Sequence, residues 1–105
     1  REAPGGAWRQ TDFSNHGRWV DCCAPGVAIP STFLTTRGLA DKPPFKGWAT
    51  WTGTSFSCPQ VSAAIAALAA RDGIEPSLAA HRLVRDPSRP RIGSIGTFVE
   101  AEKLP

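Results

Sequence analysis

The longest run of small and apolar residues predicts a helix over residues 54–71. Larger apolar side chains recur there at helical spacing among many alanines: Val61, Ile65 and Leu68. Asp72-Gly73 is a usual helix stop, and Pro59 lies in or just after the first turn, where a missing N–H is tolerated. Because the alanines leave no broad charged face, we expect this helix to be buried on most sides, at the centre of a larger structure.

The remaining elements follow from apolar runs and from proline and glycine. A second helix is predicted for Pro76 to Arg85, since proline suits its first turn and Asp86-Pro87 closes it. Three extended stretches, the first two of them half-buried, are predicted for residues 19–23, 27–33 and 48–51, and a strand or turn for residues 92–99. Residues 1–12 and the polar segment at 35–47 are typical of surface loops.

Composition narrows the class of protein. A chain of 105 residues is long enough for one domain. The net charge is +3, but basic and acidic residues are interleaved, so we do not expect a nucleic-acid site. The apolar stretch from Ala63 to Ala70 is too short for a membrane span.

Three cysteines lack the spacing of a zinc site: Cys22, Cys23 and Cys58. We therefore expect no metal and no cofactor, and we interpret the thiols as small buried hydrophobic groups. A disulfide and a reactive thiol stay open as alternatives.

Ser55 is the candidate for chemistry. It follows Gly53 in a tight turn and opens the long helix, where backbone N–H groups and the helix dipole favour an anion. A serine hydroxyl needs such donors, and a base, to act as a nucleophile. A serine in this place is also a common helix N-cap, so its position alone leaves both interpretations open.

Two blocks of sequence carry a resemblance. The run Gly53-Thr54-Ser55-Phe56-Ser57-Cys58-Pro59 is similar to the serine motif of the subtilisin-like serine proteases, the peptidase S8 family. The segment Phe13-Ser14-Asn15-His16-Gly17, followed by Val20-Asp21 and Ala24-Pro25-Gly26, resembles the block that precedes this serine in that family. The resemblance covers residues 12–72 well. Ser57 and Gln60 depart from it, since the family usually has alanine and often histidine there.

The resemblance implies a function and a fold. Ser55 would be the nucleophile of a Ser-His-Asp triad, its N–H would help to bind the oxyanion, and Thr54 would lie against the substrate. The fold implied is an α/β three-layer sandwich with a mostly parallel sheet, and residues 1–105 would be the C-terminal portion of one such domain. The substrate would be a protein or peptide, and the family suggests an extracellular, secreted enzyme.

The other triad residues are not evident in this chain. In the family the aspartate, the histidine and the oxyanion asparagine precede the Phe-Ser-Asn block, so we expect them in an N-terminal part of the catalytic domain, which would then be a partner of these residues. Asp12 and His16 stand in the right order before Ser55 but belong to the wrong block, so we reject them as a triad. His81 is predicted to be a partly exposed helical residue. The resemblance implies that Asp21 supports the strand and turn, or at most neighbours a weak cation site.

Two hypotheses follow. In the first, the chain is the serine-bearing part of a secreted endopeptidase and is inactive alone, since it lacks the base. In the second, it is a truncated, catalytically inactive relative that serves, if at all, as an interaction module. Large apolar surfaces left without a partner favour the first.

Overall fold

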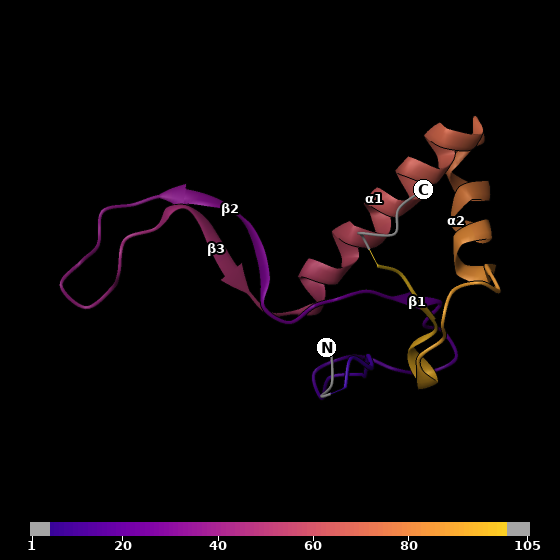
Figure 1. The fold of residues 1–105 in the computed structure, drawn as a ribbon, viewed down its shortest axis with the longest axis horizontal. Helices are drawn as coiled ribbons and strands as arrows, with labels where there is room; N and C mark the ends of the chain where they lie inside the picture. Colours follow the sequence, from indigo (N-terminus) through magenta and orange to yellow (C-terminus); the bar gives the residue numbers. More distant parts are fainter. Residues whose placement is uncertain (1–4, 101–105) are drawn as a thin grey trace.

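The computed structural model describes residues 5–100 as an α/β arrangement of two helices and short strands (Figure 1). The elements in chain order are β1 (Cys22–Cys23), β2 (Ile29–Thr35), β3 (Lys46–Trp51), α1 (Thr54–Asp72), α2 (Pro76–Arg85), the 3-10 turn η1 (Gly93–Ile95) and β4 (Thr97–Phe98). Both predicted helices are confirmed, and so is a turn with a short strand near the C-terminal end of the described residues.

Local chemistry explains where the helices end. Gly73 takes a left-handed conformation, with φ 62° and ψ 40°, and its N–H donates to the carbonyl of Ala69. Pro76 opens α2, and Asp86 follows its last residue in an extended conformation. The sequence contains these stops itself, which is why the predicted boundaries hold within one residue.

The strands form two separate pairs. β1 runs parallel to β4, with Cys22 opposite Thr97 and Cys23 opposite Phe98. β2 and β3 form an antiparallel hairpin, with Ile29 opposite Trp51. Among residues 5–100, the parallel sheet that we expected is thus represented by β1 and β4 alone.

The first predicted strand, residues 19–23, is shorter than expected. Only Cys22–Cys23 is a strand, because the N–H of Val20 donates to the carbonyl of Gly17 in a turn and so cannot join a ladder. The pairing is continued on either side of β1 by the N–H of Thr97, which donates to the carbonyl of Asp21, and by the N–H of Val99, which donates to the carbonyl of Cys23.

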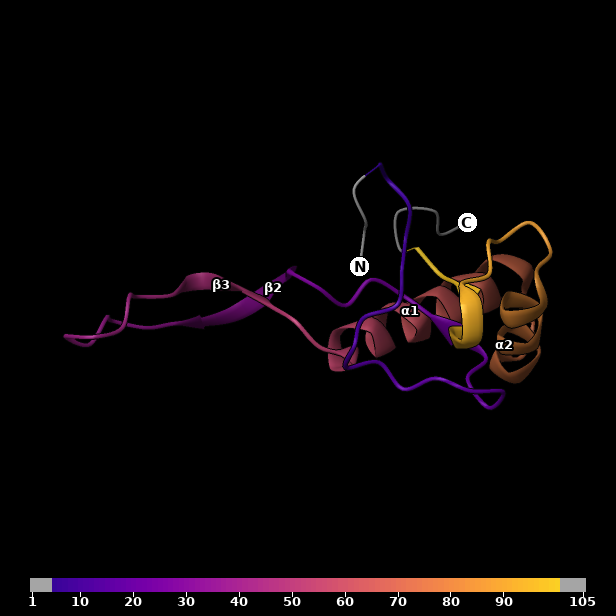
Figure 2. The same cartoon turned by 90° about the horizontal axis from the view of Figure 1, so that it is seen from below.

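The core lies where α1 and α2 meet the C-terminal tail, the described segment that follows β4 and contains Val99 (Figure 2). Its buried residues come from α1, α2 and the segment after β4: Ala64, Leu68, Ala79, Leu83 and Val99. Within residues 5–100 only Ala64 and Leu68 of α1 are buried, so burial of this helix on most sides stays a prediction for a larger structure. α2 packs on one side of α1, near its C-terminal half, and leaves the first turns open.

The hairpin of β2 and β3 projects away from the helices in both views (Figures 1 and 2). We expected residues 27–33 to be half-buried, and this is wrong beyond Ile29, because every later residue of β2 is exposed. A two-stranded ribbon covers neither of its own faces, so its side chains stay open unless another element packs on them. The loop between the strands is at the surface, as predicted.

No helix within residues 5–100 combines the length and the apolar character needed to cross a lipid bilayer.

Candidate active site

Ser55 is the second residue of α1 and is exposed. Gly53, the residue before the helix, adopts φ 156° and ψ 160°, a backbone conformation that glycine alone reaches readily. The N–H of Phe56 donates to the carbonyl of Gly53 at 3.1 Å and closes the first turn. The glycine therefore lets the chain turn sharply from β3 into the helix and presents Ser55 at its tip.

Hydrogen bonds fix this turn to the Ala24-Pro25-Gly26 segment. The N–H of Gly53 donates to the carbonyl of Gly26 at 2.8 Å. From the helix, Ser57 Oγ donates to the carbonyl of Pro25 at 3.1 Å, and Gln60 Nε2 donates to the same oxygen at 2.7 Å. Three bonds thus join two segments that are about thirty residues apart in sequence, so the start of α1 is held in place from outside the helix.

Ser57 and Gln60 are functional positions that the sequence reasoning undervalued. Both appeared only as departures from a family pattern, yet their side chains make the bonds that hold the turn. Their spacing of three residues places them on one face of α1, next to each other. Two polar side chains on one face of an otherwise apolar helix could have indicated that both donate hydrogen bonds to the same acceptor.

The hydroxyl of Ser55 has no hydrogen-bond partner among residues 5–100. The first N–H groups of any helix lack an acceptor inside the helix, and the dipole makes this end positive. Thr54, the first residue of α1, is exposed beside it. The arrangement can therefore present an oxygen nucleophile next to backbone donors for a negative oxygen.

The described residues bring no histidine to Ser55. The shallow depression around it is lined by the first turns of α1 alone: Thr54, Ser55, Cys58, Pro59 and Ser62. His81 is an exposed residue of α2 and lines a different depression, with Asp72 and Arg82. His16 is exposed in the segment before β1. Neither histidine therefore lies among the residues that line the depression around Ser55.

Asp21 lies at the exposed start of the β1 pairing. Its backbone carbonyl accepts the N–H of Thr97 at 3.0 Å, which supports the strand as we expected from its position. Among residues 5–100, no three histidine, cysteine or acidic side chains gather in a way that could hold a metal ion.

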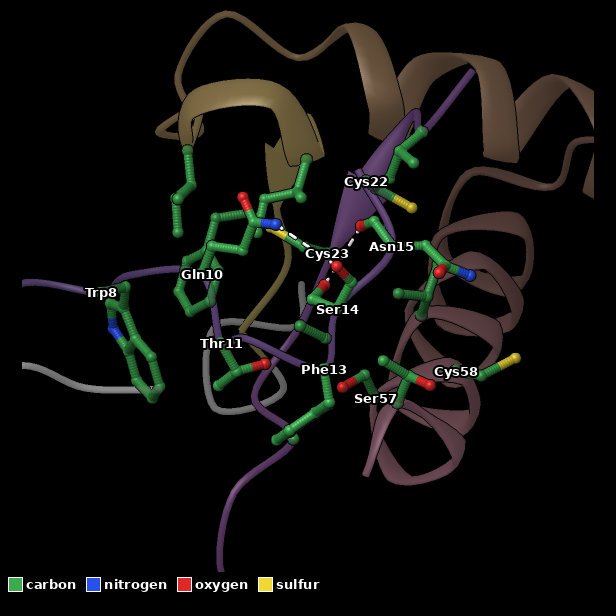
Figure 3. A pocket seen from close by; sticks show the side chains of 18 of the residues that line it. Trp8, Gln10, Thr11, Phe13, Ser14, Asn15, Cys22, Cys23, Ser57 and Cys58 are labelled. Carbon is green, nitrogen blue, oxygen red and sulfur yellow. Dashed lines mark hydrogen bonds between the residues drawn. The ribbon is translucent and has the colours of Figure 1, made fainter. Parts of the chain in front are cut away.

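A hollow of about 350 Å³ lies between α1 and the segment before β1 (Figure 3). The three cysteines line it together with aromatic side chains, including Phe13 and Phe98. Burial and the neighbouring Cys22 thiol raise the pKa of Cys23 to about 11, and burial also raises the pKa of Cys22, with Asp21 and Cys58 adding to it. All three thiols are free.

The interpretation of all three cysteines as buried groups is wrong for Cys58. Cys22 and Cys23 are half-buried, whereas Cys58 is exposed in the first turns of α1. It lines both the hollow between α1 and the segment before β1 and the depression around Ser55. Its exposure has the same cause as that of Ser55, since neither α2 nor the tail reaches this end of the helix.

Comparison with known proteins gives consistent matches. The family model of the subtilase family matches residues 7–86. A thermophilic serine proteinase of Bacillus sp. (strain AK1) is 43% identical over 65 residues, which are 62% of this chain and 14% of that protein. An alkaline proteinase of Hapsidospora chrysogena is 33% identical over 76 residues, 72% of this chain and 17% of the relative.

A subtilisin-like protease of Coccidioides posadasii (strain C735) is 37% identical over 87 residues, 83% of this chain and 19% of that protein. The chain thus spans less than a fifth of the length of these three relatives. No solved structure is a significant match. Since the family model covers most of the chain and includes the turn that carries Ser55, the chain belongs to the subtilase family.

Proposed function

We propose that these residues are the nucleophile-bearing part of a secreted serine endopeptidase, with Ser55 as the nucleophile. The observation that carries the proposal is the position of Ser55, exposed at the tip of the Gly53 turn with an unpartnered hydroxyl, inside the family's serine motif. The substrate is a protein or peptide, and the reaction is acyl transfer. No cofactor takes part.

The reaction would use the start of α1 as follows. Ser55 Oγ attacks the carbonyl carbon of the scissile bond while a histidine takes the hydroxyl proton. The carbonyl oxygen becomes an oxyanion, and the N–H of Ser55 donates to it, aided by the positive end of the helix. The histidine returns the proton to the leaving amine, and water then releases the acyl group. Thr54 lies beside the bound chain.

The histidine, its aspartate and an asparagine donor come from another part of the polypeptide, in a three-layer α/β sandwich with a mostly parallel sheet. The exposed first turns of α1 support this, because Phe56 is half-buried while Ser55 and Cys58 are exposed. A helix with so few buried residues at its reactive end has room for a packing partner there.

A fluorophosphonate probe, which reacts with activated serines, tests the proposal. We expect the 105-residue chain alone to label slowly, because a serine without a base is not activated. The complete polypeptide from the same reading frame should label once per chain. Ser55→Ala should abolish labelling there, whereas Ser77→Ala, a control of the same chemistry on exposed α2, should keep it.

Two outcomes would contradict the proposal. If the complete polypeptide does not label, the catalytically inactive relative is the correct interpretation. If the 105-residue chain labels rapidly and once per molecule, the base lies within these residues and the inferred partner is wrong.

A further inference from the structure

The hairpin of β2 and β3 concentrates the exposed apolar surface of the described residues. Its exposed large side chains are Phe33, Leu34, Leu39, Trp48 and Trp51, with relative exposures of 47%, 70%, 71%, 66% and 62%. Only Phe13, Trp19 and Leu78 are comparably exposed elsewhere in residues 5–100. Exposed apolar side chains gathered on one element indicate an interaction surface, while single exposed residues need no explanation.

The far half of the hairpin is positively charged. Arg37, Lys42 and Lys46 lie there with one acidic residue, Asp41, and all four are exposed. At the same end, the rings of Phe33 and Phe45 pack edge to face with their centres 4.9 Å apart. A partner that complements this end therefore combines apolar with acidic side chains.

β3 has a free backbone edge that leads to Ser55. Within the described residues β3 pairs with β2 on one side only, so its other edge presents unpaired N–H and C=O groups. Pro30 of β2 has no N–H, so that strand offers one backbone donor fewer. After Trp51, the chain reaches Ser55 through Thr52 and the Gly53 turn.

The base of the hairpin is tied to the same turn as Ser55. The N–H of Ala28 donates to Thr52 Oγ1 at 2.9 Å, and the N–H of Gly53 donates to the carbonyl of Gly26 at 2.8 Å. β3 therefore keeps a fixed relation to the nucleophile. A chain lying along its edge would be held in register with Ser55.

We propose that the β3 edge is an extended substrate-binding surface, which takes a stretch of polypeptide with apolar residues near the scissile bond and acidic residues farther from it. The proposal rests on the proposed function of Ser55. Strand addition supplies main-chain hydrogen bonds, and alternate side chains supply specificity. At about 3.4 Å per residue, the step from Trp51 to Lys46 spans about 17 Å, so recognition extends at least five residues along the substrate.

Peptide binding to the 105-residue chain tests this without hydrolysis. The probe is a fluorescein-labelled twelve-residue peptide with apolar residues followed by four Asp or Glu residues, measured by anisotropy on the Ser55→Ala variant. We expect Lys46→Glu to weaken binding at least tenfold, and a peptide with Lys in place of its acidic residues to restore it. Arg85→Glu, on exposed α2, is the matched control and should leave the Kd unchanged.

A second variant addresses the apolar part. Trp48→Ser should weaken binding of the same peptide, while Leu78→Ser on α2 should leave its Kd unchanged. In the complete protease, kcat/KM should fall for peptides cut to fewer than five residues on the side of the scissile bond that lies along β3, while fluorophosphonate labelling of Ser55 is unchanged. Failure of the labelling would refute the proposed function, whereas failure of the length dependence alone would refute the surface.

Other occupants of the hairpin give different results, and each would overturn the proposal. Equal Kd values for acidic, neutral and basic peptides would show nonspecific contact. A blue shift of tryptophan fluorescence with phosphatidylserine vesicles, without peptide binding, would assign the surface to anionic lipid. Dimers that dissociate on Trp48→Ser, again without peptide binding, would assign it to a second copy.

Discussion

The two ends of the molecule differ in how they are held. At one end, α2, the second half of α1 and the tail bury each other around Leu68, Leu83 and Val99. At the other end, the hairpin and the first turns of α1 are joined by hydrogen bonds and have almost no buried apolar side chain. Apolar burial stabilises the first end, while hydrogen bonds hold the backbone of the second end in position.

Ser55 lies at the second end, away from the core. Ser55 is exposed, and the backbone of its turn is fixed through Pro25, Gly26 and Gly53 instead of by apolar burial. The buried residues of α1 and the proposed nucleophile therefore lie in opposite halves of one helix. Substitutions at the two ends should therefore change different measurements.

The largest effect should come from the core. Leu83 has 2% exposure, and Leu83→Ala leaves a cavity, so we expect the free energy of unfolding to fall by about 2–5 kcal/mol. Leu39→Ala, on the hairpin at 71% exposure, is the matched control and should change it by less than about 0.5 kcal/mol. Urea unfolding followed by circular dichroism measures both. Equal losses would refute the contrast between the ends.

The next largest effect should be a difference in thiol reactivity between Cys58 and Cys23. Cys58 is exposed in the first turns of α1, close in sequence to Ser55, whereas Cys23 is half-buried and its pKa is raised to about 11. At pH 8 roughly one Cys23 in a thousand is thiolate, the reactive form. With iodoacetamide and mass spectrometry, we expect Cys58 to react at least tenfold faster than Cys23. Faster alkylation of Cys23 than of Cys58 would contradict the partial burial of the Cys23 thiol.

The smallest effect should come from the residue that follows α2. Hydrogen bonds from Ser88 lower the pKa of Asp86 below its usual 3.8, with Arg89 adding to the shift. A lowered pKa in the folded state stabilises it above the usual value, and that contribution is lost as the pH falls through the lowered pKa. Since the side chain is 36% exposed, we expect less than about 1 kcal/mol.

Asp86→Asn tests this sign. The free energy of unfolding of wild type minus that of the variant should be positive at pH 7 and should shrink towards zero or below as the pH is lowered to 2. Asp41→Asn in the exposed hairpin loop provides a control of the same chemistry. A difference that grows on acidification would show that the carboxylate destabilises the fold.

The helices were predictable because residues close in sequence determine where each helix begins and ends. Gly73 and Pro76 fix where one helix stops and the next starts, through backbone conformations that need no distant partner. The turn before Ser55 was predictable for the same reason, since Gly53 supplies a conformation that other residues avoid.

The strands and the burial of α1 depend on distant residues and were harder to predict. β1 pairs with β4, which comes more than seventy residues later in the chain, and no local pattern shows this pairing. The exposure of Cys58 follows from which part of α1 is covered by α2. Apolar periodicity indicates which face of a helix is hydrophobic, but it does not show whether another segment packs on that face.

The contact between Gly26 and Gly53 closes the whole hairpin as a loop. Gly26 is buried, and a Cβ there would lie 2.5 Å from Ser57 Oγ and 3.1 Å from the carbonyl oxygen of Gly53. The two ends of the loop thus meet backbone to backbone, whatever lies between them. Insertions between residues 36 and 45 should be tolerated, since doubling a loop costs only about 0.6 kcal/mol. Evolution or grafting could exchange the hairpin's tip and leave Ser55 where it is.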